Sequence, residues 1–166
     1  FRHEIYPDYK ANRSEMPKEM QDQLVHLWEI LDSMNIPLLK KNGLEADDII
    51  GTFAKNAKTE GLLTYIVSGD KDFTQLVDED VLLYAPGMKK SSEPIIYDAV
   101  KVEQKWGVQP KNIIDLFGLM GDSSDNVPGV PGIGVKTAAE LINKYKNLET
   151  LLKKAEEIPQ KKRKQT

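Results

Sequence analysis

Seven carboxylates lie in three short clusters along this chain, spaced closely enough within each cluster to act together. The clusters are Glu45-Ala46-Asp47-Asp48, Gly69-Asp70-Lys71-Asp72 and Gly121-Asp122-Ser123-Ser124-Asp125-Asn126. Carboxylates at this density repel one another unless cations bind between them. Hard divalent cations such as Mg²⁺ take oxygen ligands, whereas softer metals prefer cysteine and histidine, and this chain has no cysteine and two histidines. The clusters therefore indicate a site for hard divalent cations.

Two divalent ions held a few Å apart can stabilise both the attacking and the leaving oxygen of a phosphodiester, so the pattern predicts a metal-dependent nuclease. Each cluster by itself has a simpler interpretation, as acids in a first helical turn, as a capped turn, or as a loop that caps the next element. The three clusters together favour the metal site. The candidate ligands, direct or through water, are Glu45, Asp47, Asp48, Asp70, Asp72, Asp122 and Asp125.

The third cluster leads into the glycine-rich segment Gly129-Val130-Pro131-Gly132-Ile133-Gly134-Val135-Lys136-Thr137. This segment resembles the hairpin of a helix-hairpin-helix motif. Its glycines permit left-handed backbone and let main-chain N–H groups approach a phosphate at a helix N-terminus. Such contacts do not depend on base sequence and suit binding to a DNA structure. The alternative is a glycine-rich turn between two packed helices. The candidate DNA-binding residues here are Gly132, Gly134, Lys136 and Thr137.

Composition limits the remaining possibilities. A chain of 166 residues suits one domain with a hydrophobic core, and the absence of cysteine excludes disulfides and thiolate metal sites. No apolar run approaches the ~18 residues that span a bilayer, and no secretory signal pattern is present, so we expect an intracellular protein. The formal net charge of −3 argues against nucleic-acid binding, but two bound divalent ions would change that charge to +1.

The periodicity of apolar residues predicts the elements that must position these groups. Strands are expected at 36–39, 63–68, 81–84 and 95–97, and helices at 17–34, 45–59, 98–106, 110–120, 135–145 and 148–156. We expect the strand at 63–68 to be buried on both faces and Trp28 to lie in the core. The alternation of strands and helices predicts an α/β sheet with crossover helices, followed by a helical half. Asp70 and Asp72 would then follow the carboxyl end of a strand, where ligands bind in such folds.

Several segments together identify a family resemblance. They are Phe1-Arg2-His3-Glu4, Tyr9-Lys10-Ala11-Asn12-Arg13, the three carboxylate clusters, Gln75-Leu76 and the run from Gly121 through Gly134. Over nearly its whole length the chain resembles the 5′-nuclease (flap endonuclease-like) domain of bacterial DNA polymerase I. The resemblance implies a PIN-like α/β core with a mostly parallel sheet at 1–109, a helix-hairpin-helix region at 110–158 and a basic tail at 159–166.

The same resemblance implies two Mg²⁺ or Mn²⁺ ions, and duplex DNA bound at the hairpin, often with K⁺. It implies an arch in which Lys10 and Arg13 act on the scissile phosphate. Tyr9 could stack on a displaced base or pack within its own loop. The expected activity is 5′-3′ exonuclease and flap endonuclease on DNA with 5′ flaps, nicks or ends, in bacterial DNA replication and repair. We expect a cytoplasmic, nucleoid-associated protein, without a membrane and with a polymerase domain linked in the full-length protein.

The resemblance also implies two further metal-site aspartates on N-terminal strands, ahead of Phe1, and a later end to the nuclease domain. Two other functions therefore stay open. One is a non-catalytic module that binds DNA structures, which would follow from an incomplete metal site. The other is a PIN-like RNA nuclease, which the helix-hairpin-helix signal disfavours.

Overall fold

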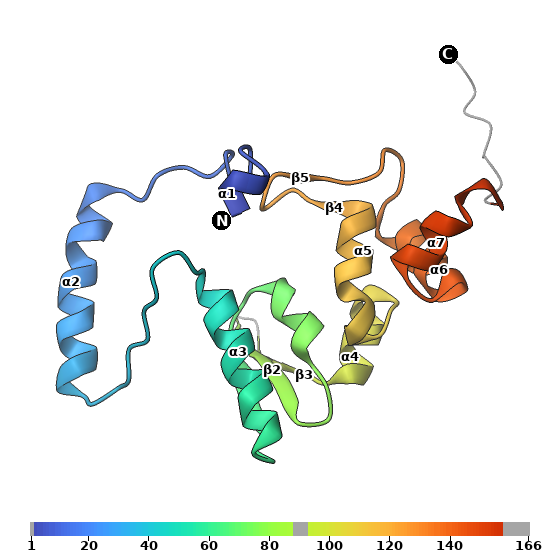
Figure 1. The fold of residues 1–166 in the computed structure, drawn as a ribbon. Coiled ribbons are helices and arrows are strands. Elements are labelled where there is room, and N and C mark those ends of the chain that lie inside the picture. Colours follow the sequence, from blue (N-terminus) through green and yellow to red (C-terminus); the bar gives the residue numbers. More distant parts are fainter. Residues whose placement is uncertain (1, 88–92, 158–166) are drawn as a thin grey trace.

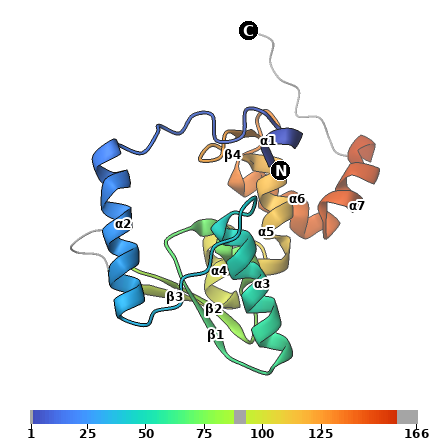
Figure 2. The ribbon, with the colours of Figure 1, turned by 60° about the vertical axis from the view of Figure 1, so that its left-hand side comes forward.

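The computed structural model describes residues 2–87 and 93–157 and combines a small sheet with helices (Figures 1 and 2). Helix α1 (Arg2–Ile5) and helix α2 (Lys18–Ser33) precede helix α3 (Ala46–Thr59) and strand β1 (Thr64–Val67). The 3₁₀ helix η1 (Lys71–Leu76) leads to strands β2 (Val81–Ala85) and β3 (Ile95–Tyr97). The predicted tail at 159–166 lies outside the described residues.

The sheet has the order β1-β2-β3 and is mixed. Strand β1 pairs parallel with β2, with Ile66 opposite Leu83, whereas β2 pairs antiparallel with β3, with Leu83 opposite Tyr97. The connection at 86–94 is shorter than the crossover of a dozen or more residues that a parallel neighbour requires. The α/β class is confirmed. Because β3 pairs antiparallel with β2, the sheet is not mostly parallel within the described residues.

The second half is helical, as predicted. Its elements are α4 (Ala99–Trp106), the 3₁₀ helix η2 (Pro110–Asn112), α5 (Ile113–Met120), α6 (Val135–Tyr145), α7 (Leu148–Lys153) and the 3₁₀ helix η3 (Ala155–Glu157). Between α5 and α6, the two-residue strands β4 (Gly121–Asp122) and β5 (Val127–Pro128) pair antiparallel. The side chain of Asp98 caps α4 by accepting a hydrogen bond from the Lys101 amide, and Gly107 ends it with φ +75°.

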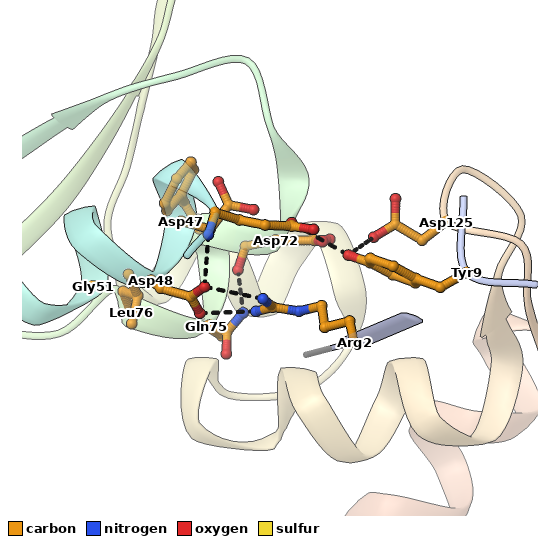
Figure 3. Close-up of a pocket in the computed structure, with 11 residues that line it drawn as sticks. Arg2, Tyr9, Asp47, Asp48, Gly51, Asp72, Gln75, Leu76 and Asp125 are labelled. Atoms are coloured by element: carbon orange, nitrogen blue, oxygen red, sulfur yellow. Dashed lines mark hydrogen bonds and ion pairs between the residues drawn. The ribbon is translucent and has the colours of Figure 1, made fainter. Parts of the chain in front are cut away.

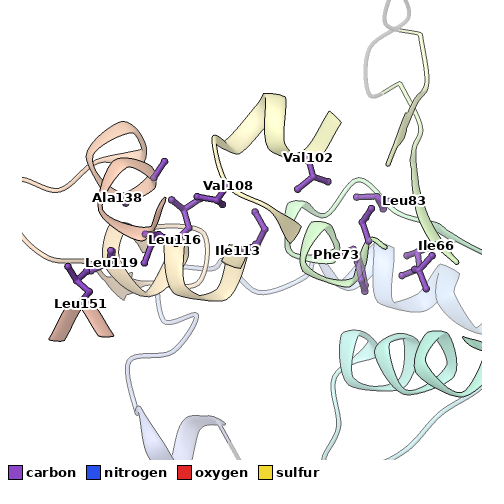
Figure 4. Packing of buried hydrophobic residues seen from close by; sticks show 14 of the residues in the cluster. Ile66, Phe73, Leu83, Val102, Val108, Ile113, Leu116, Leu119, Ala138 and Leu151 are labelled. Carbon is purple, nitrogen blue, oxygen red and sulfur yellow. The ribbon is translucent and has the colours of Figure 1, made fainter. Parts of the chain in front are cut away.

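One hydrophobic cluster joins the sheet to the helical half (Figure 4). Phe73 of η1 and Leu83 of β2 lie at its sheet end, and Ile113 and Leu116 of α5 are fully buried in the helical part. Because η1 contributes to this core, the backbone that carries Asp72 is anchored on one side. The core therefore fixes one wall of the predicted metal site.

Helix α2 does not pack as its sequence predicts. None of its residues is buried, and the indole of Trp28 stays 38% exposed beneath the amino group of Lys40. Figures 1 and 2 show α2 standing apart from the sheet, between two irregular segments. The strand predicted at 36–39 is part of one of these segments and is not a strand. Helical periodicity indicates which face is apolar, but it does not supply the partner that would cover that face.

Strand β1 also differs from its prediction, because it is buried on one face only. Ile66 is 4% exposed, whereas Tyr65 and Val67 are 50% and 68% exposed. On α3, Ala54 is the one buried residue and Phe53 is 55% exposed. A continuous apolar run is compatible with burial on two faces but does not require it. Among the described residues, no helix combines the length and apolar character needed to cross a membrane.

Candidate metal centre

The second carboxylate cluster lies directly beyond the carboxyl end of β1, as predicted. Asp70 caps η1, because its side chain accepts a hydrogen bond from the Asp72 amide at 3.0 Å. The Asp72 carboxyl group is partly buried, and its Oδ1 atom has no hydrogen-bond partner in the described structure. A buried carboxylate oxygen without a hydrogen-bond partner destabilises the fold unless a ligand contacts it. Asp72 is thus the carboxylate of the site that most requires a cation.

The first cluster forms the N-terminus of α3. Glu45 Oε2 accepts hydrogen bonds from Lys10 Nζ at 2.6 Å and from the Tyr9 hydroxyl at 3.3 Å. Asp48 accepts two hydrogen bonds from the Arg2 guanidinium, at 2.8 and 2.9 Å, and one from the Glu45 amide at 2.9 Å. Asp48 therefore links α1 to the start of α3, and the Arg2 guanidinium contacts both of its oxygen atoms (Figure 3).

The third cluster occupies the turn between β4 and β5. Asp122 Oδ1 accepts hydrogen bonds from Lys71 Nζ at 2.7 Å and from the Ser124 amide at 2.8 Å. Asp125 accepts hydrogen bonds from Arg13 at 2.6 Å and from the Tyr9 hydroxyl at 2.9 Å. This turn is thereby tied both to η1 and to the Tyr9–Arg13 loop.

Two glycines allow the β4–β5 turn to close. Gly121 has φ +76°, and a Cβ atom there would lie 2.3 Å from the Gly129 amide nitrogen. A Cβ atom at Gly129 would lie 2.2 Å from the carbonyl carbon of Met120. Side chains cannot occupy such positions without displacing backbone. Gly129, Arg2 and Lys71 were not predicted as site residues. The alternation of carboxylates around Lys71 was the one sequence signal that could have identified that lysine.

The carboxylates differ in their electrostatic state. Burial, together with the charges of Asp70 and Asp122, raises the pKa of Asp72 to about 6. Burial and the charge of Asp70 likewise raise the pKa of Asp47. These two groups carry uncompensated negative charge in the protein without metal.

The carboxylates that have cationic partners have lowered pKa values. Burial raises the pKa of Asp122, but the hydrogen bond and charge of Lys71 and the hydrogen bonds from Ser124 together outweigh burial and leave that pKa below its usual range. Burial is similarly outweighed at Glu45, whose pKa is lowered by the hydrogen bond and charge of Lys10 together with Arg2 and Tyr9. The hydrogen bonds from Arg2 lower the pKa of Asp48 to about 2.

The three clusters line two adjoining cavities of about 280 Å³ each. The first is lined by residues that include Glu45, Asp47, Asp48, Asp72 and Asp125, and Figure 3 shows several of them from α3, η1 and the β4–β5 turn. The second is lined by residues that include Arg13, Asp70, Asp72, Asp122 and Asp125. Asp72 and Asp125 belong to both. All seven predicted ligands therefore line one cavity or both.

The carboxylates are near one another but do not form a closed coordination shell. Among the described residues, no three metal-binding side chains converge on one point. Lys10, Arg13, Lys71 and Arg2 instead pair with carboxylates. The donors are all oxygen atoms, two of the carboxylates repel their neighbours and one buried oxygen has no partner. This donor set fits hard divalent cations.

Tyr9 lies inside the carboxylate site, whereas the hairpin residues lie outside both cavities. The Tyr9 ring is 9% exposed and its hydroxyl binds carboxylates, so its side chain packs within the site and is not open to stack on a base. Gly132 has φ +82°, and Gly134 precedes the first turn of α6 with open space around its Cα. Lys136 and Thr137 are exposed in that turn. These hairpin residues line neither carboxylate cavity.

Comparison with known proteins agrees with this geometry. A family model for the N-terminal, resolvase-like domain of 5′-3′ exonucleases matches residues 1–107, and one for their C-terminal SAM fold matches residues 108–166. The chain belongs to the 5′-3′ exonuclease family. The boundary between the two models is close to the division predicted at residue 109, which remains a proposal for this chain.

Curated relatives of this chain include DNA polymerase I of Rhizobium leguminosarum, 46% identical over 166 residues, and that of Bacillus subtilis, 42% identical over 165 residues. The alignments cover 100% and 99% of this chain but 16% and 19% of those relatives. The 5′-3′ exonuclease of Buchnera aphidicola subsp. Schizaphis graminum is 42% identical over 95% of this chain and 53% of its own length. The chain thus spans about half the length of that relative, and a smaller part of the polymerases.

Solved structures share the fold. The bacteriophage T5 5′-exonuclease with bound zinc ions superposes with a TM-score of 0.80 at 24% identity, over 98% of this chain and 62% of its own. The catalytic core of Rad2 in complex with a DNA substrate superposes with a TM-score of 0.59 at 24% identity, over 84% of this chain and 43% of its own. At these identities the likeness establishes the fold of this chain and not its ligands.

Proposed function

We propose that this chain is the catalytic part of a structure-specific 5′ nuclease that hydrolyses DNA phosphodiester bonds, as a 5′-3′ exonuclease and a 5′-flap endonuclease. The observation that carries the proposal is the meeting of three carboxylate clusters at two adjoining cavities that share Asp72 and Asp125. Two cavities with shared carboxylates suit two neighbouring cations. Membership of the 5′-3′ exonuclease family supports the same reaction.

Two Mg²⁺ or Mn²⁺ ions are the proposed cofactors. Glu45 and Asp47 would hold an ion in the first cavity, Asp70 and Asp122 in the second, and Asp72 and Asp125 would serve both. Bound there, the ions would lower the pKa of a water molecule and stabilise the leaving oxygen. Asp48 would act by orienting Glu45, because Arg2 already holds both of its oxygen atoms. The T5 5′-exonuclease with bound zinc ions supports a divalent-metal site in this fold.

Lys10 and Arg13 are proposed to neutralise the scissile phosphate. Both side chains lie at the site, where Lys10 pairs with Glu45 and Arg13 pairs with Asp125. Cations in the cavities would compete for these carboxylates and free both side chains to donate hydrogen bonds to phosphate oxygens. Donors that are already positioned act strongly on charge that develops in the transition state. The Tyr9 hydroxyl would hold Glu45 and Asp125 at their proper separation.

The hairpin before α6 is proposed to bind the duplex part of the substrate, with K⁺ as a further ligand. Gly132 and Gly134 are exposed, no atom lies within 4 Å of a Cβ atom built at Gly134, and Lys136 and Thr137 are exposed beside them. The proposed substrates are DNA flaps, nicks and 5′ ends in bacterial replication and repair. In the full-length protein, a linked polymerase domain at the nucleoid would follow from the DNA polymerase I relatives.

The test is cleavage of a labelled 5′-flap DNA under single-turnover conditions, with Mg²⁺ and with EDTA. We expect cleavage only with the divalent ion, and loss of at least 100-fold in rate for Asp72→Asn, as expected when electrostatic stabilisation of a transition state is removed. Lys10→Ala should lower the rate while leaving DNA affinity in Ca²⁺ within about threefold. Lys111→Ala, in η2 and away from both cavities, is the matched control.

Two outcomes would favour the other functions. Tight binding of the flap without cleavage by this chain at any Mg²⁺ concentration would support a DNA-structure binding module. Faster cleavage of a matched single-stranded RNA than of the DNA flap would support an RNA nuclease. Binding to the DNA in Ca²⁺ should weaken steeply with added salt, since phosphate contacts release counterions.

A further inference from the structure

Another recess, distinct from the two carboxylate cavities, lies at the opposite end of the strands. It is an open groove of about 690 Å³ between the start of β2, helix α4 and the 3₁₀ helix η2. Strands β1 and β2 are parallel, so the start of β2 is distant from the end of β1 where Asp70 and Asp72 lie. No residue that lines this groove lines either carboxylate cavity. The groove is therefore separate from the proposed catalytic site.

One part of the groove lining, called the floor below, is apolar. It contains Val77, Leu82, Val100 and Pro110, from the turn before β2, from β2, from α4 and from η2. Val77 is buried, but Val100 is 62% exposed in the first turn of α4. An apolar floor open to water favours a ligand that brings its own apolar side chain.

The other part of the lining, called the rim below, is acidic. Four carboxylates line it, from Asp78, Glu79, Asp98 and Glu103, against the single cation of Lys111. Asp78 pairs with Lys58 and Asp98 caps α4, so these two have local partners. Within the described part of the chain, the carboxyl groups of Glu79 and Glu103 form no hydrogen bond or ion pair. They belong to the turn before β2 and to α4, line the same groove and are available to a ligand.

This combination selects one class of ligand. A nucleic acid would be repelled by the rim, because Lys111 is the one lysine or arginine among the described residues that line the groove. A small anion is disfavoured for the same reason. We propose that the groove docks a basic segment of a partner protein, with an apolar side chain on the floor and lysine or arginine side chains at Glu79 and Glu103. Because the groove and the carboxylate cavities lie at opposite ends of the strands, the partner and DNA can bind together.

The test uses a fluorescein-labelled model peptide of twelve residues that alternates pairs of leucine and lysine, with the protein in Mg²⁺. Fluorescence anisotropy should show saturable binding of this peptide and none of the same peptide with glutamate in place of lysine. The double variant Glu79→Lys/Glu103→Lys should bind at least tenfold more weakly. Val100→Ser should weaken binding severalfold without a change in charge. Glu140→Lys/Glu149→Lys, which makes the same charge change on α6 and α7, is the matched control and should bind as the parent does.

Hydrogen exchange separates this groove from the acidic metal site, which could also attract a cationic peptide. Protection should appear in residues 77–82 and 98–103 and persist when a flap DNA is bound. Equal peptide affinity of the parent and the Glu79→Lys/Glu103→Lys variant would overturn the proposal. Protection confined to the neighbourhood of Asp47 and Asp72, or no binding at all, would overturn it as well.

Discussion

At the scale of single residues, the carboxylates of this site differ in what their charge does to the fold. Asp72 faces Asp70 and Asp122 without a cation at its Oδ1 atom, so ionisation destabilises the folded protein. Asp122 receives hydrogen bonds from Lys71 and from the Ser124 amide, so its ionised form is stabilised. Replacement of these two aspartates should therefore have opposite effects on stability without metal.

Asp72→Asn should stabilise the metal-free protein at alkaline pH. The pKa of Asp72 is about 6 when folded and 3.8 ordinarily, so the folded state retains its proton while the unfolded chain releases it. Stability therefore falls as pH rises from about 4 to 6, and the loss is complete above that range. In EDTA at pH 8 we expect the free energy of unfolding to rise by about 1 kcal/mol, after allowance for solvent screening, with little change at pH 4. Urea melts at both pH values measure this difference.

Asp122→Asn serves as the comparison. In the folded parent the pKa of Asp122 is lowered, so the ionised carboxylate stabilises the fold above its ordinary pKa. That stabilisation is lost as the pH falls through the pKa of the folded state. We expect this variant to be less stable than the parent at pH 8 in EDTA. A shift in the same direction for both variants would contradict the account of Asp72. Added Mg²⁺ should stabilise the parent more than either variant, by mass action.

Arg2→Met should weaken the link between α1 and α3. The two hydrogen bonds from Arg2 lower the pKa of Asp48 to about 2, so the pair stabilises the fold at neutral pH and loses that effect as pH falls from about 4 towards 2. Both side chains are partly exposed, and we expect a loss of about 1 kcal/mol at pH 7. Urea melts of variant and parent should differ less at pH 3. An equal difference at pH 3 and pH 7 would indicate lost packing instead.

At the scale of elements, the site depends on how closely the β4–β5 turn approaches the end of α5. The Lys10 amide donates a hydrogen bond to the Asp125 carbonyl, and the Val130 amide donates one to the Leu119 carbonyl. These bonds hold the turn between the Tyr9–Arg13 loop and α5. The absence of a side chain at Gly129 is what permits this arrangement.

Gly129→Ala should displace the turn and its two aspartates. The added Cβ atom would overlap backbone atoms of Met120 and Gly121, which cannot rotate away as a side chain can. We expect a loss of about 1–3 kcal/mol, as for other overpacked sites, and a smaller increase of Tm with Mg²⁺. Gly134→Ala is the control, because no atom lies within 4 Å of its added Cβ. A Gly129→Ala protein with the parent's metal-dependent Tm shift would show that the turn tolerates displacement.

At the scale of the whole molecule, apolar residues divide into a packed core and an exposed apolar surface. Phe73 lies in the cluster that joins the sheet to the helical half, and is 4% exposed. Phe53 of α3 is 55% exposed beside β1, and the apolar face of α2 is also uncovered. The two phenylalanines are alike in sequence context, since each lies in a helical segment that follows carboxylates.

Phe73→Ala and Phe53→Ala should accordingly differ widely in this chain. We expect Phe73→Ala to lower the free energy of unfolding by about 3–5 kcal/mol, because it leaves a cavity in the core. Phe53→Ala should change it by about 0.5 kcal/mol or less, as other exposed substitutions do. Denaturant titrations of both variants provide the measurement. Comparable losses would show that α3 is packed more closely than its exposure indicates.

The sequence alone determined the local structure of this protein well. The helix beginning after Glu45, the strand before Asp70 and the helical second half follow from periodicity, caps and glycines, which act over a few residues. The sequence also identified the carboxylates that line the two cavities, whereas their role as ligands of hard cations stays a prediction. The glycines of the hairpin were recognisable for the same local reason.

Only the tertiary structure decided which of these groups meet and which apolar faces are covered. The pairing of Arg2 with Asp48 joins residues 46 positions apart, and that of Lys71 with Asp122 joins residues 51 apart. No local pattern encodes such contacts. Trp28 and the segment at 36–39 had the pattern of buried elements, yet burial depends on a packing partner, and among the described residues the contacts leave Trp28 38% and Leu39 54% exposed. The positions of Tyr9 inside the site and of Gly129 against α5 likewise follow from close approach in space, which spacing in sequence does not specify.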